Sequence, residues 1–281
     1  MNSRRKRKII DGFHYALMAA ASIGVGATLT GIIAYILIQS AGRFNLSVIF
    51  GPVTESFLPM IAATAWTVVV SLAIALPVGI MTAIYLHEYA SRSRLSRFLG
   101  VAIDTLAGIP SIIYGLFGLL LFCRVLNLGQ SVIAGGLTLS IMILPVIIRT
   151  TEEALKTVPN SFREGSLSLG ATKYQTIIHA VLPPSLPGIL TAAILAIGRV
   201  VGESAPVLFT VGIAKNLPKT IFEGGRTLTI HLYYLTKEAI SPDDFAQAFT
   251  AAAVLIIFIL IINTAVKIIG GSLGFTGENI D

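Results

Sequence analysis

An arginine and a glutamate lie four residues apart inside a strongly apolar stretch. They belong to the segment Ile197-Gly198-Arg199-Val200-Val201-Gly202-Glu203-Ser204-Ala205-Pro206. Residues four apart share one face of a helix, so the two side chains can form an ion pair. A charged side chain at the centre of a bilayer costs at least ~2.5–3.5 kcal/mol on insertion scales, and the residues that bear this cost are mostly functional. Arg199 and Glu203 are therefore the first candidate site.

The chemistry that suits this pair is oxyanion binding. The planar guanidinium of Arg199 donates two parallel hydrogen bonds and does not lose its charge. Glu203 would neutralise the empty guanidinium, and an arriving anion would displace it. Pro206 clashes with the carbonyl of Gly202 and should loosen the helix beside Glu203. The alternative is a structural ion pair that fixes this helix to a neighbour, although buried pairs often contribute little net stability.

The composition is that of an integral membrane protein. Hydrophobic residues make up 54% of the 281 residues and charged residues 12%, against about 25% charged in a typical soluble domain. The net charge of +6 comes from basic residues that flank apolar segments, which fits lipid head groups and argues against nucleic acid. The single Cys123 excludes an internal disulfide. We expect no catalytic residues, no metal site and no cofactor.

Six apolar stretches can each supply the roughly 20 residues that a membrane-spanning helix needs. They are Phe13–Ile38, Leu58–Leu86, Phe98–Phe122, Ser131–Ile148, Pro187–Ile213 and Phe245–Ile269. The first is too long for the apolar core of a cleaved signal peptide. With the N-terminus inside, 13 Lys and Arg residues are cytoplasmic, 6 are outside and Arg199 lies within a span. The sequence therefore predicts an all-α membrane protein with six transmembrane helices and cytoplasmic N and C termini.

This topology gives a domain plan. Residues 1–12 form a basic cytoplasmic N-terminus, residues 13–270 the membrane domain and residues 271–281 a cytoplasmic tail. A fifth span that starts at Pro187 places Arg199 about 18 Å along the helix, near the middle of the bilayer.

Several other residues inside the spans have simpler interpretations. Pro77, Pro110 and Pro145 are either ordinary irregularities of membrane helices or hinges. Asp104 is expected to complement the positive N-terminal end of span three. Tyr114 and its small neighbours are expected to mediate close helix packing rather than to line a pore; these neighbours are Gly108, Ser111, Gly115 and Gly118.

The cytoplasmic loop between spans four and five, residues 150–186, looks structured. Ser161 and Glu164 fit a capping box, and Gly170 fits a left-handed helix end. Thr172 and Gln175 repeat the capping signature, and Leu182-Pro183-Pro184 should end the second helix. The sequence predicts two short helices bent at Gly170; a solvated helical hairpin without function remains an alternative.

This loop resembles the coupling loop of bacterial ABC importer permeases. The family pattern is Glu-Ala-Ala, three residues, Gly, nine residues, Ile, any residue, Leu-Pro. The chain has Glu164, Gly165 and Ser166, then Gly170, and finally Ala180, Leu182 and Pro183. It departs from the pattern at Gly165, Ser166 and Ala180, in each case with a small residue.

The resemblance extends to the PstA family of phosphate-importer permeases. It includes the run Leu144–Leu155, the run Gly108–Gly118 and the segment from Arg199 to Thr210. It implies a type I ABC importer permease fold in the bacterial inner membrane, with a phosphate pathway at Arg199 and Glu203. The coupling residues would be Ser161, Glu164, Gly165, Ser166, Gly170, Leu182 and Pro183. The implied partners are a PstC-like second permease, two PstB-like ATPase subunits and a PstS-like extracytoplasmic phosphate-binding protein.

The chain has no Gly-x-x-x-x-Gly-Lys-Ser/Thr loop, so energy from ATP would have to come from a partner. Two other functions stay open. One is a permease for another oxyanion, such as molybdate or sulfate. The other is a proton-coupled secondary carrier with Glu203 as its proton site, which would not need the capped cytoplasmic loop.

Overall fold

The computed structural model describes residues 2–42, 51, 56–90 and 93–272, and every regular element within them is a helix. Among these described residues, five helices are long and apolar enough to cross a membrane: Ile10–Ser40, Leu58–Tyr89, Val132–Thr157, Lys173–Gly202 and Pro242–Gly270. A sixth crossing exists if the bent pair Arg94–Ala107 and Ser111–Val125 is counted as one span. The predicted all-α membrane architecture is confirmed, with the third span bent sharply into two helices.

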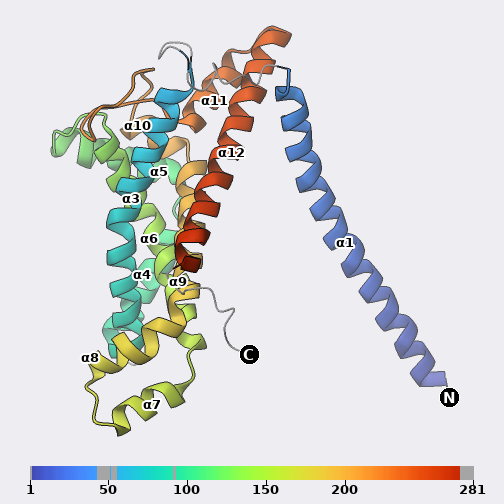
Figure 1. Ribbon diagram of the computed structural model, residues 1–281, viewed down its shortest axis with the longest axis vertical. Coiled ribbons are helices and arrows are strands. Elements are labelled where there is room, and N and C mark those ends of the chain that lie inside the picture. The colour runs from blue at the N-terminus through green and yellow to red at the C-terminus, as the bar shows by residue number, and fades with distance from the viewer. Residues whose placement is uncertain (1, 43–50, 52–55, 91–92, 273–281) are drawn as a thin grey trace.

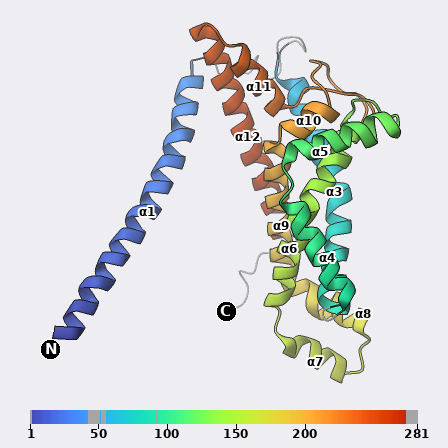
Figure 2. The same cartoon turned by 180° about the vertical axis from the view of Figure 1, so that it is seen from behind.

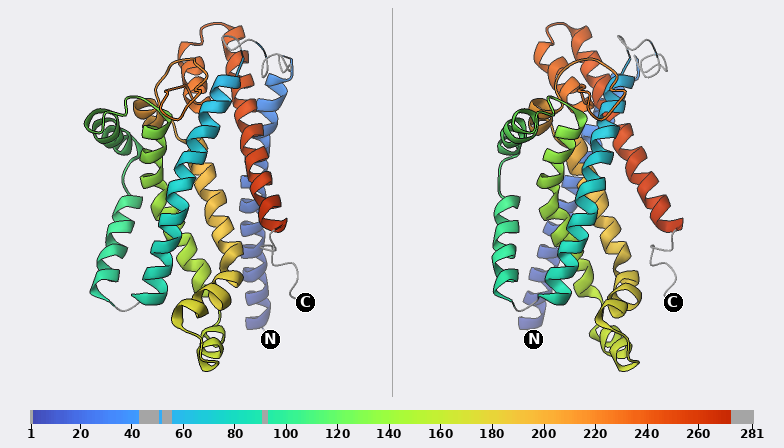
Figure 3. Two further views of the ribbon diagram at one scale, coloured as in Figure 1. Left: turned by 60° about the vertical axis from the view of Figure 1, so that its left-hand side comes forward. Right: turned by 90° about the vertical axis from the view of Figure 1, so that its left-hand side faces the viewer.

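The third predicted span, Phe98–Phe122, is not straight but bends sharply at Pro110, one of the expected irregularities or hinges. Helix α4 (Arg94–Ala107) ends before Pro110, and α5 (Ser111–Gly118) then starts at an angle of 98° to it. Pro110 is the N-cap of α5 and is extended, with ψ 138°. Ile109, which precedes this proline, is disfavoured in the α region, so the helix cannot easily continue through it. Figure 3 shows α4 upright, with the segment that follows it turned away.

Three helices form the centre of the bundle. Helix α6 (Val132–Thr157) packs against both α3 (Leu58–Ile84) and α9 (Leu182–Gly202). Small residues let these helices approach closely: a Cβ at Gly79 would lie 2.6 Å from Ile147 Cγ2. Pro77 and Pro145 lie inside α3 and α6, and both helices continue through them. The buried core between the three helices includes Val68, Ala75, Leu139, Met142, Ile143, Ile147, Ala196 and Ile197.

Three helical runs in the described part of the chain contain π-helical segments. Segment η1 (Tyr85–Tyr89) extends α3, and η2 (Leu119–Val125) extends α5. Segment η3 (Ile177–Val181) joins α8 (Lys173–Thr176) directly to α9. Such wide turns are rare and occur frequently at functional sites.

The two ends of the bundle carry different elements (Figures 1 and 2). Helices α7 (Asn160–Ser168) and α8 lie at the end where α1 (Asn2–Ser40) begins and toward which α12 (Pro242–Ser272) runs. Helices α5, α10 (Ala205–Thr210) and α11 (Leu228–Glu238) lie at the opposite end. This arrangement matches an even number of crossings. Of the predicted tail at 271–281, residues 273–281 lie outside the described part of the chain.

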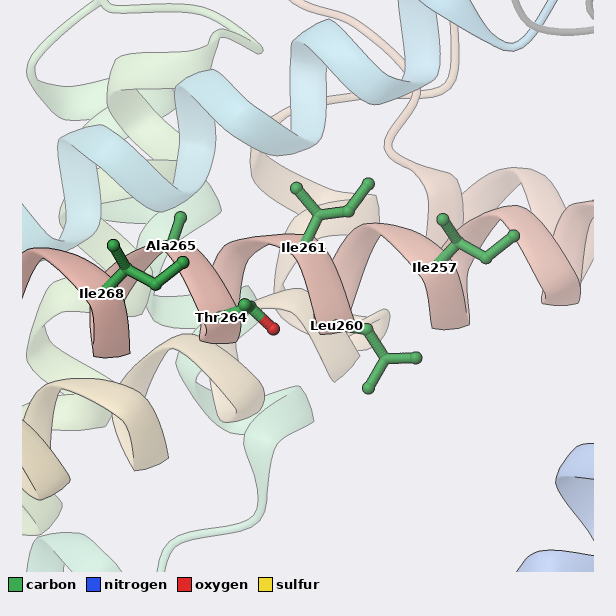
Figure 4. Close-up of a pocket in the computed structure, with 6 residues that line it drawn as sticks. All are labelled: Ile257, Leu260, Ile261, Thr264, Ala265 and Ile268. Carbon is green, nitrogen blue, oxygen red and sulfur yellow. The ribbon is translucent and has the colours of Figure 1, made fainter.

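Helix α1 leans away from the bundle in Figure 1 and touches α12 near its upper end, where the Tyr35 and Phe249 rings are 5.5 Å apart. Its apolar side chains are largely exposed: Ile23 is 71% and Ile38 is 73% accessible. Figure 4 shows an apolar hollow along one face of α12, lined by Ile257, Leu260, Ile261, Thr264, Ala265 and Ile268. These apolar surfaces suit lipid chains or another membrane helix, and they offer no charged group to an ion.

Candidate functional site

Arg199 and Glu203 lie at a break in the fifth span. Helix α9 ends at Gly202, and Glu203 is extended, with φ −77° and ψ 134°. Helix α10 then begins at Ala205, with Pro206 in its first turn. The predicted continuous span Pro187–Ile213 is therefore wrong. Because the Pro206 ring would clash with the carbonyl of Gly202, the helix does not loosen there but ends.

The two charges form a loose pair. Arg199 Nε is 3.8 Å from Glu203 Oε1, beyond hydrogen-bond distance. The Arg199 side chain is 33% exposed and the Glu203 side chain 17%. Within residues 56–90 and 93–272 the guanidinium makes no hydrogen bond, so its N–H donors are available to a ligand.

The position of Arg199 along its helix differs from the expectation. Helix α9 starts at Leu182, not near Pro187, and it directly continues the run from α8. At 1.5 Å per residue, Arg199 is about 25 Å beyond Leu182 and lies in the last turn of α9. The partial negative charge at a helix C-terminus favours a cation there. The arginine thus belongs to the end of a broken helix, next to α10.

The loop between spans four and five has the predicted bend. Gly170 has φ +85°, in the left-handed region that glycine tolerates best. Thr172 and Gln175 form the predicted capping box at α8, where Thr172 N donates to Gln175 Oε1 over 2.8 Å. The Ser166 and Thr176 hydroxyls are 3.0 Å apart and join α7 to α8.

Two other predictions for this loop are wrong. Pro159, not Ser161, is the N-cap of α7, and the cap has no side-chain hydrogen bond. Proline fixes φ near −65°, so Pro159 sets the chain direction two residues before the predicted N-cap Ser161. Pro183 and Pro184 do not end a helix but occupy the first turn of α9, because the fixed φ of proline near −65° is compatible with a helix.

The residues that the family resemblance assigns to coupling lie mostly on the exposed part of the loop. Ser161, Glu164, Gly165, Gly170 and Pro183 are exposed, and Ser166 and Leu182 are half-buried. Apolar side chains lie beside them on the same segment: Leu169 is 90% exposed, and Phe162 and Leu167 are each 50% exposed. Such a surface at the end of the bundle fits contact with another protein.

An ion pair that sequence reasoning missed anchors this loop. Arg163 Nη2 donates to Glu88 Oε1 over 2.7 Å, and the side chains are 16% and 8% exposed. Arg163 also donates to the carbonyls of Val158 and Leu155. The pair joins α7 to η1, 75 residues earlier in the chain, so no local pattern could have revealed it. Its one sequence signal is an arginine directly before Glu164.

Asp104 does not complement a helix N-terminus. It lies in the last turn of α4 and accepts hydrogen bonds from Arg149 Nε and Nη2, over 2.9 and 2.6 Å. Arg149 also donates to Glu152 Oε2 over 2.8 Å and to the carbonyl of Gly100 over 3.0 Å. The cluster fastens α4 to α6, and these two carboxylates leave it a net negative charge that would repel an anion.

Two of the four small residues of the third span, Gly115 and Gly118, pack as predicted, whereas Gly108 is exposed. A Cβ at Gly115 would lie 2.9 Å from Pro206 Cα, and one at Gly118 would collide with Thr138. Tyr114 is buried and donates to the carbonyl of Leu106 over 2.7 Å, which ties α5 back to α4. The bent pair therefore rests against α10, directly beside the break that holds Glu203.

A buried histidine lies at the end of the bundle opposite α7. His231 on α11 contacts the Phe57 ring at a centroid distance of 5.2 Å, and its Nδ1 has no hydrogen-bond partner among the described residues. Burial, helped by the charges of Lys215 and Arg226, lowers the pKa of His231 to about 4. The imidazole is therefore neutral at pH 7.

Comparisons with known proteins agree with this architecture. Residues 75–274 match the family described as binding-protein-dependent transport system inner membrane component. The probable ABC transporter permease protein YqgI of Bacillus subtilis (strain 168) is 31% identical over 287 residues, covering 94% of this chain and 96% of the relative. The phosphate transport system permease protein PstA 1 of Mycobacterium tuberculosis (strain CDC 1551 / Oshkosh) is 40% identical over 202 residues, covering 71% of this chain and 66% of the relative, a little under two thirds.

Two solved structures share the fold. The inward-facing MetNI methionine ABC transporter aligns with a TM-score of 0.59 and 20% identity, over 79% of this chain and 94% of that chain. A bacterial ABC transporter involved in the import of the acidic polysaccharide alginate aligns with a TM-score of 0.60 and 15% identity, over 94% and 99%. The family match extends from the middle of α3 through the α7–α8 loop and the Arg199 segment to the end of α12. The chain belongs to the family of binding-protein-dependent transport system inner membrane components.

Proposed function

We propose that this chain is a PstA-like permease subunit of an ATP-driven phosphate importer, and that phosphate passes the break between α9 and α10. The observation that carries the proposal is the loosely paired Arg199, whose guanidinium lies 3.8 Å from Glu203 and is one-third exposed. The 40% identity to PstA 1 over 202 residues supports phosphate as the anion.

The geometry suits an anion that binds and then leaves. Arg199 offers a planar set of N–H donors that matches two oxygens of phosphate. Glu203 supplies the counter-charge when the site is empty and competes with the anion when it is full. The carboxylate therefore limits how tightly phosphate is held, which transport requires.

Energy would come through the loop formed by α7 and α8. We propose that Glu164, Gly165, Ser166 and Gly170, with the exposed apolar side chains beside them, dock on a PstB-like ATPase. Ser161, Leu182 and Pro183 would flank this contact. Arg163, held by Glu88, would carry a movement of the loop to η1 and α3. ATP hydrolysis is then the partner's reaction, and the complex would hold two ATPase subunits.

The remaining partners complete the importer. A PstC-like permease would form the second half of the pathway, and a PstS-like binding protein would deliver phosphate at the end that carries α10 and α11. Residues 1–12 and the tail at 271–281 would face the cytoplasm, with residues 13–270 in the inner membrane of a bacterial cell.

Phosphate uptake by reconstituted complexes tests the anion role. Arg199→Ala should abolish uptake, and Arg199→Lys should nearly do so because an ammonium cannot reproduce the bidentate fork. Glu203→Gln should hold the anion more tightly and turn over more slowly. The matched control is Arg124→Ala, which removes an exposed arginine on η2.

Four outcomes would contradict the proposal. Wild-type uptake by the Arg199→Ala complex, or full rescue by the Arg199→Glu/Glu203→Arg exchange, would reduce the pair to a structural role. Import of molybdate or sulfate in place of phosphate would reassign the substrate. Uptake without ATP, driven by a proton gradient, would indicate a secondary carrier.

A further inference from the structure

The backbone carbonyl of Glu203 needs a hydrogen-bond donor from outside α9. It belongs to the residue that caps α9, so no later N–H of that helix can reach it. The carbonyl lies at a partly buried position, where leaving it unpaired costs free energy. The chain must therefore supply a donor from elsewhere.

One donor within reach is Arg199 itself. Arginine side chains in the last turn of a helix can bond the final carbonyls. Arg199 lies in the last turn of α9, four residues before Glu203. If it capped the helix in this way, its N–H groups would be occupied and lost to an anion.

The structure uses Thr229 instead. Thr229 Oγ1 donates to the carbonyl of Glu203 over 2.9 Å, from a residue 26 positions later in the chain. The Thr229 hydroxyl is also 3.1 Å from that of Thr227, the N-cap residue of α11. The backbone N–H of Leu228 donates to Thr64 on α3 over 3.0 Å, so the first turn of α11 is held in place.

We propose that Thr229 is a positioning residue for anion passage: its hydroxyl caps α9 from outside and leaves the Arg199 guanidinium free to bind the anion. The inference rests on the proposed function of Arg199. In this proposal α11 supports the anion site by holding the end of α9, and no residue of α11 needs to contact phosphate.

The decisive variants separate the hydroxyl of Thr229 from its methyl group. Thr229→Val keeps the branched shape but removes the donor, and Thr229→Ser keeps the donor. Thr236→Val is the matched control, because Thr236 lies exposed on the same helix and donates to the carbonyl of Leu232 over 2.8 Å. Each variant is purified as the full complex, reconstituted with a saturating phosphate-loaded binding protein, and assayed for phosphate uptake and ATP hydrolysis.

Thr229→Val should lower the phosphate imported per ATP hydrolysed by about tenfold, which corresponds to ~1.4 kcal/mol. Thr229→Ser and Thr236→Val should stay within twofold of wild type. A merely structural hydroxyl predicts another pattern, in which the yield of complex, ATP hydrolysis and uptake fall in proportion.

That proportional loss, or wild-type coupling by Thr229→Val, would overturn the inference. Arg199→Ala is measured beside these variants to separate two failures. If Arg199→Ala retains uptake, the proposed function itself is wrong. If Arg199→Ala is inactive and Thr229→Val is normal, only the role of Thr229 is wrong.

Discussion

Gly170 offers a test of the α7–α8 loop in which one physical cause can be isolated. Its φ is +85°, and a Cβ built at this position meets nothing within 4 Å. Within this chain, a side chain there would therefore be opposed by backbone conformation alone and not by a clash. For an ordinary L-residue the left-handed conformation costs about 1–2 kcal/mol, and for asparagine less.

These values translate into a graded series. A cost of 1–2 kcal/mol lowers the population of the bent loop by roughly 5- to 30-fold relative to alternatives. Gly170→Val should therefore weaken ATPase docking most, Gly170→Ala less, and Gly170→Asn least. The assay is the amount of ATPase subunit that co-purifies with the tagged chain, together with the ATP hydrolysed by the complex.

A second glycine supplies the control. Gly31 lies in α1, also with nothing within 4 Å of a built Cβ, but without a positive φ. Gly31→Val should leave ATPase recovery at the wild-type level. If Gly170→Val couples normally, or if Gly170→Asn is as damaging as Gly170→Val, the left-handed bend does not control docking.

Two further predictions concern buried groups. Glu88→Gln removes the counter-charge of Arg163 and should destabilise the loop by about 3–5 kcal/mol, measured as a loss of co-purifying ATPase subunit. The control Glu153→Gln breaks an exposed pair with Lys156 and should behave as wild type. Equal loss from both variants would refute the anchoring role of the Glu88–Arg163 pair. His231 has a pKa of about 4 in the folded chain and about 6.5 when unfolded, so the unfolded state binds the proton first as pH falls. Stability should drop by about 2 kcal/mol between pH 7 and pH 5, measured by thermal unfolding in detergent, and an unchanged pH dependence in His231→Phe would contradict this cause.

Local chemistry in the sequence was a good guide where a single residue decides the backbone. The left-handed Gly170 and the Thr172–Gln175 capping box were both predicted and are both present. The Ser161 box was not formed, because Pro159 begins the helix earlier. The capping-box pattern takes no account of the fixed φ of a nearby proline, which here starts the helix at a different residue.

The length of an apolar stretch predicted the helices less well, because hydropathy shows how many residues could lie in a membrane but not where the helix bends or ends. The stretches Phe98–Phe122 and Pro187–Ile213 are apolar enough to cross a membrane, yet each is interrupted, at Pro110 and at Glu203. The contacts that hold the site together join residues far apart in sequence. Arg163 with Glu88, Arg149 with Asp104, and Thr229 with Glu203 depend on tertiary packing, which no local pattern encodes.

The π-helical segment η3 changes how helical faces must be mapped along this chain. A helical wheel advances by about 100° per residue, and a wide π turn inserts one additional residue. A wheel drawn from Lys173 through Ile177–Val181 to Arg199 therefore places the later side chains about 100° from their true azimuth. Cysteine-labelling or substitution scans along this run should show a jump in phase at residues 177–181, and each side of that jump has to be projected on its own wheel.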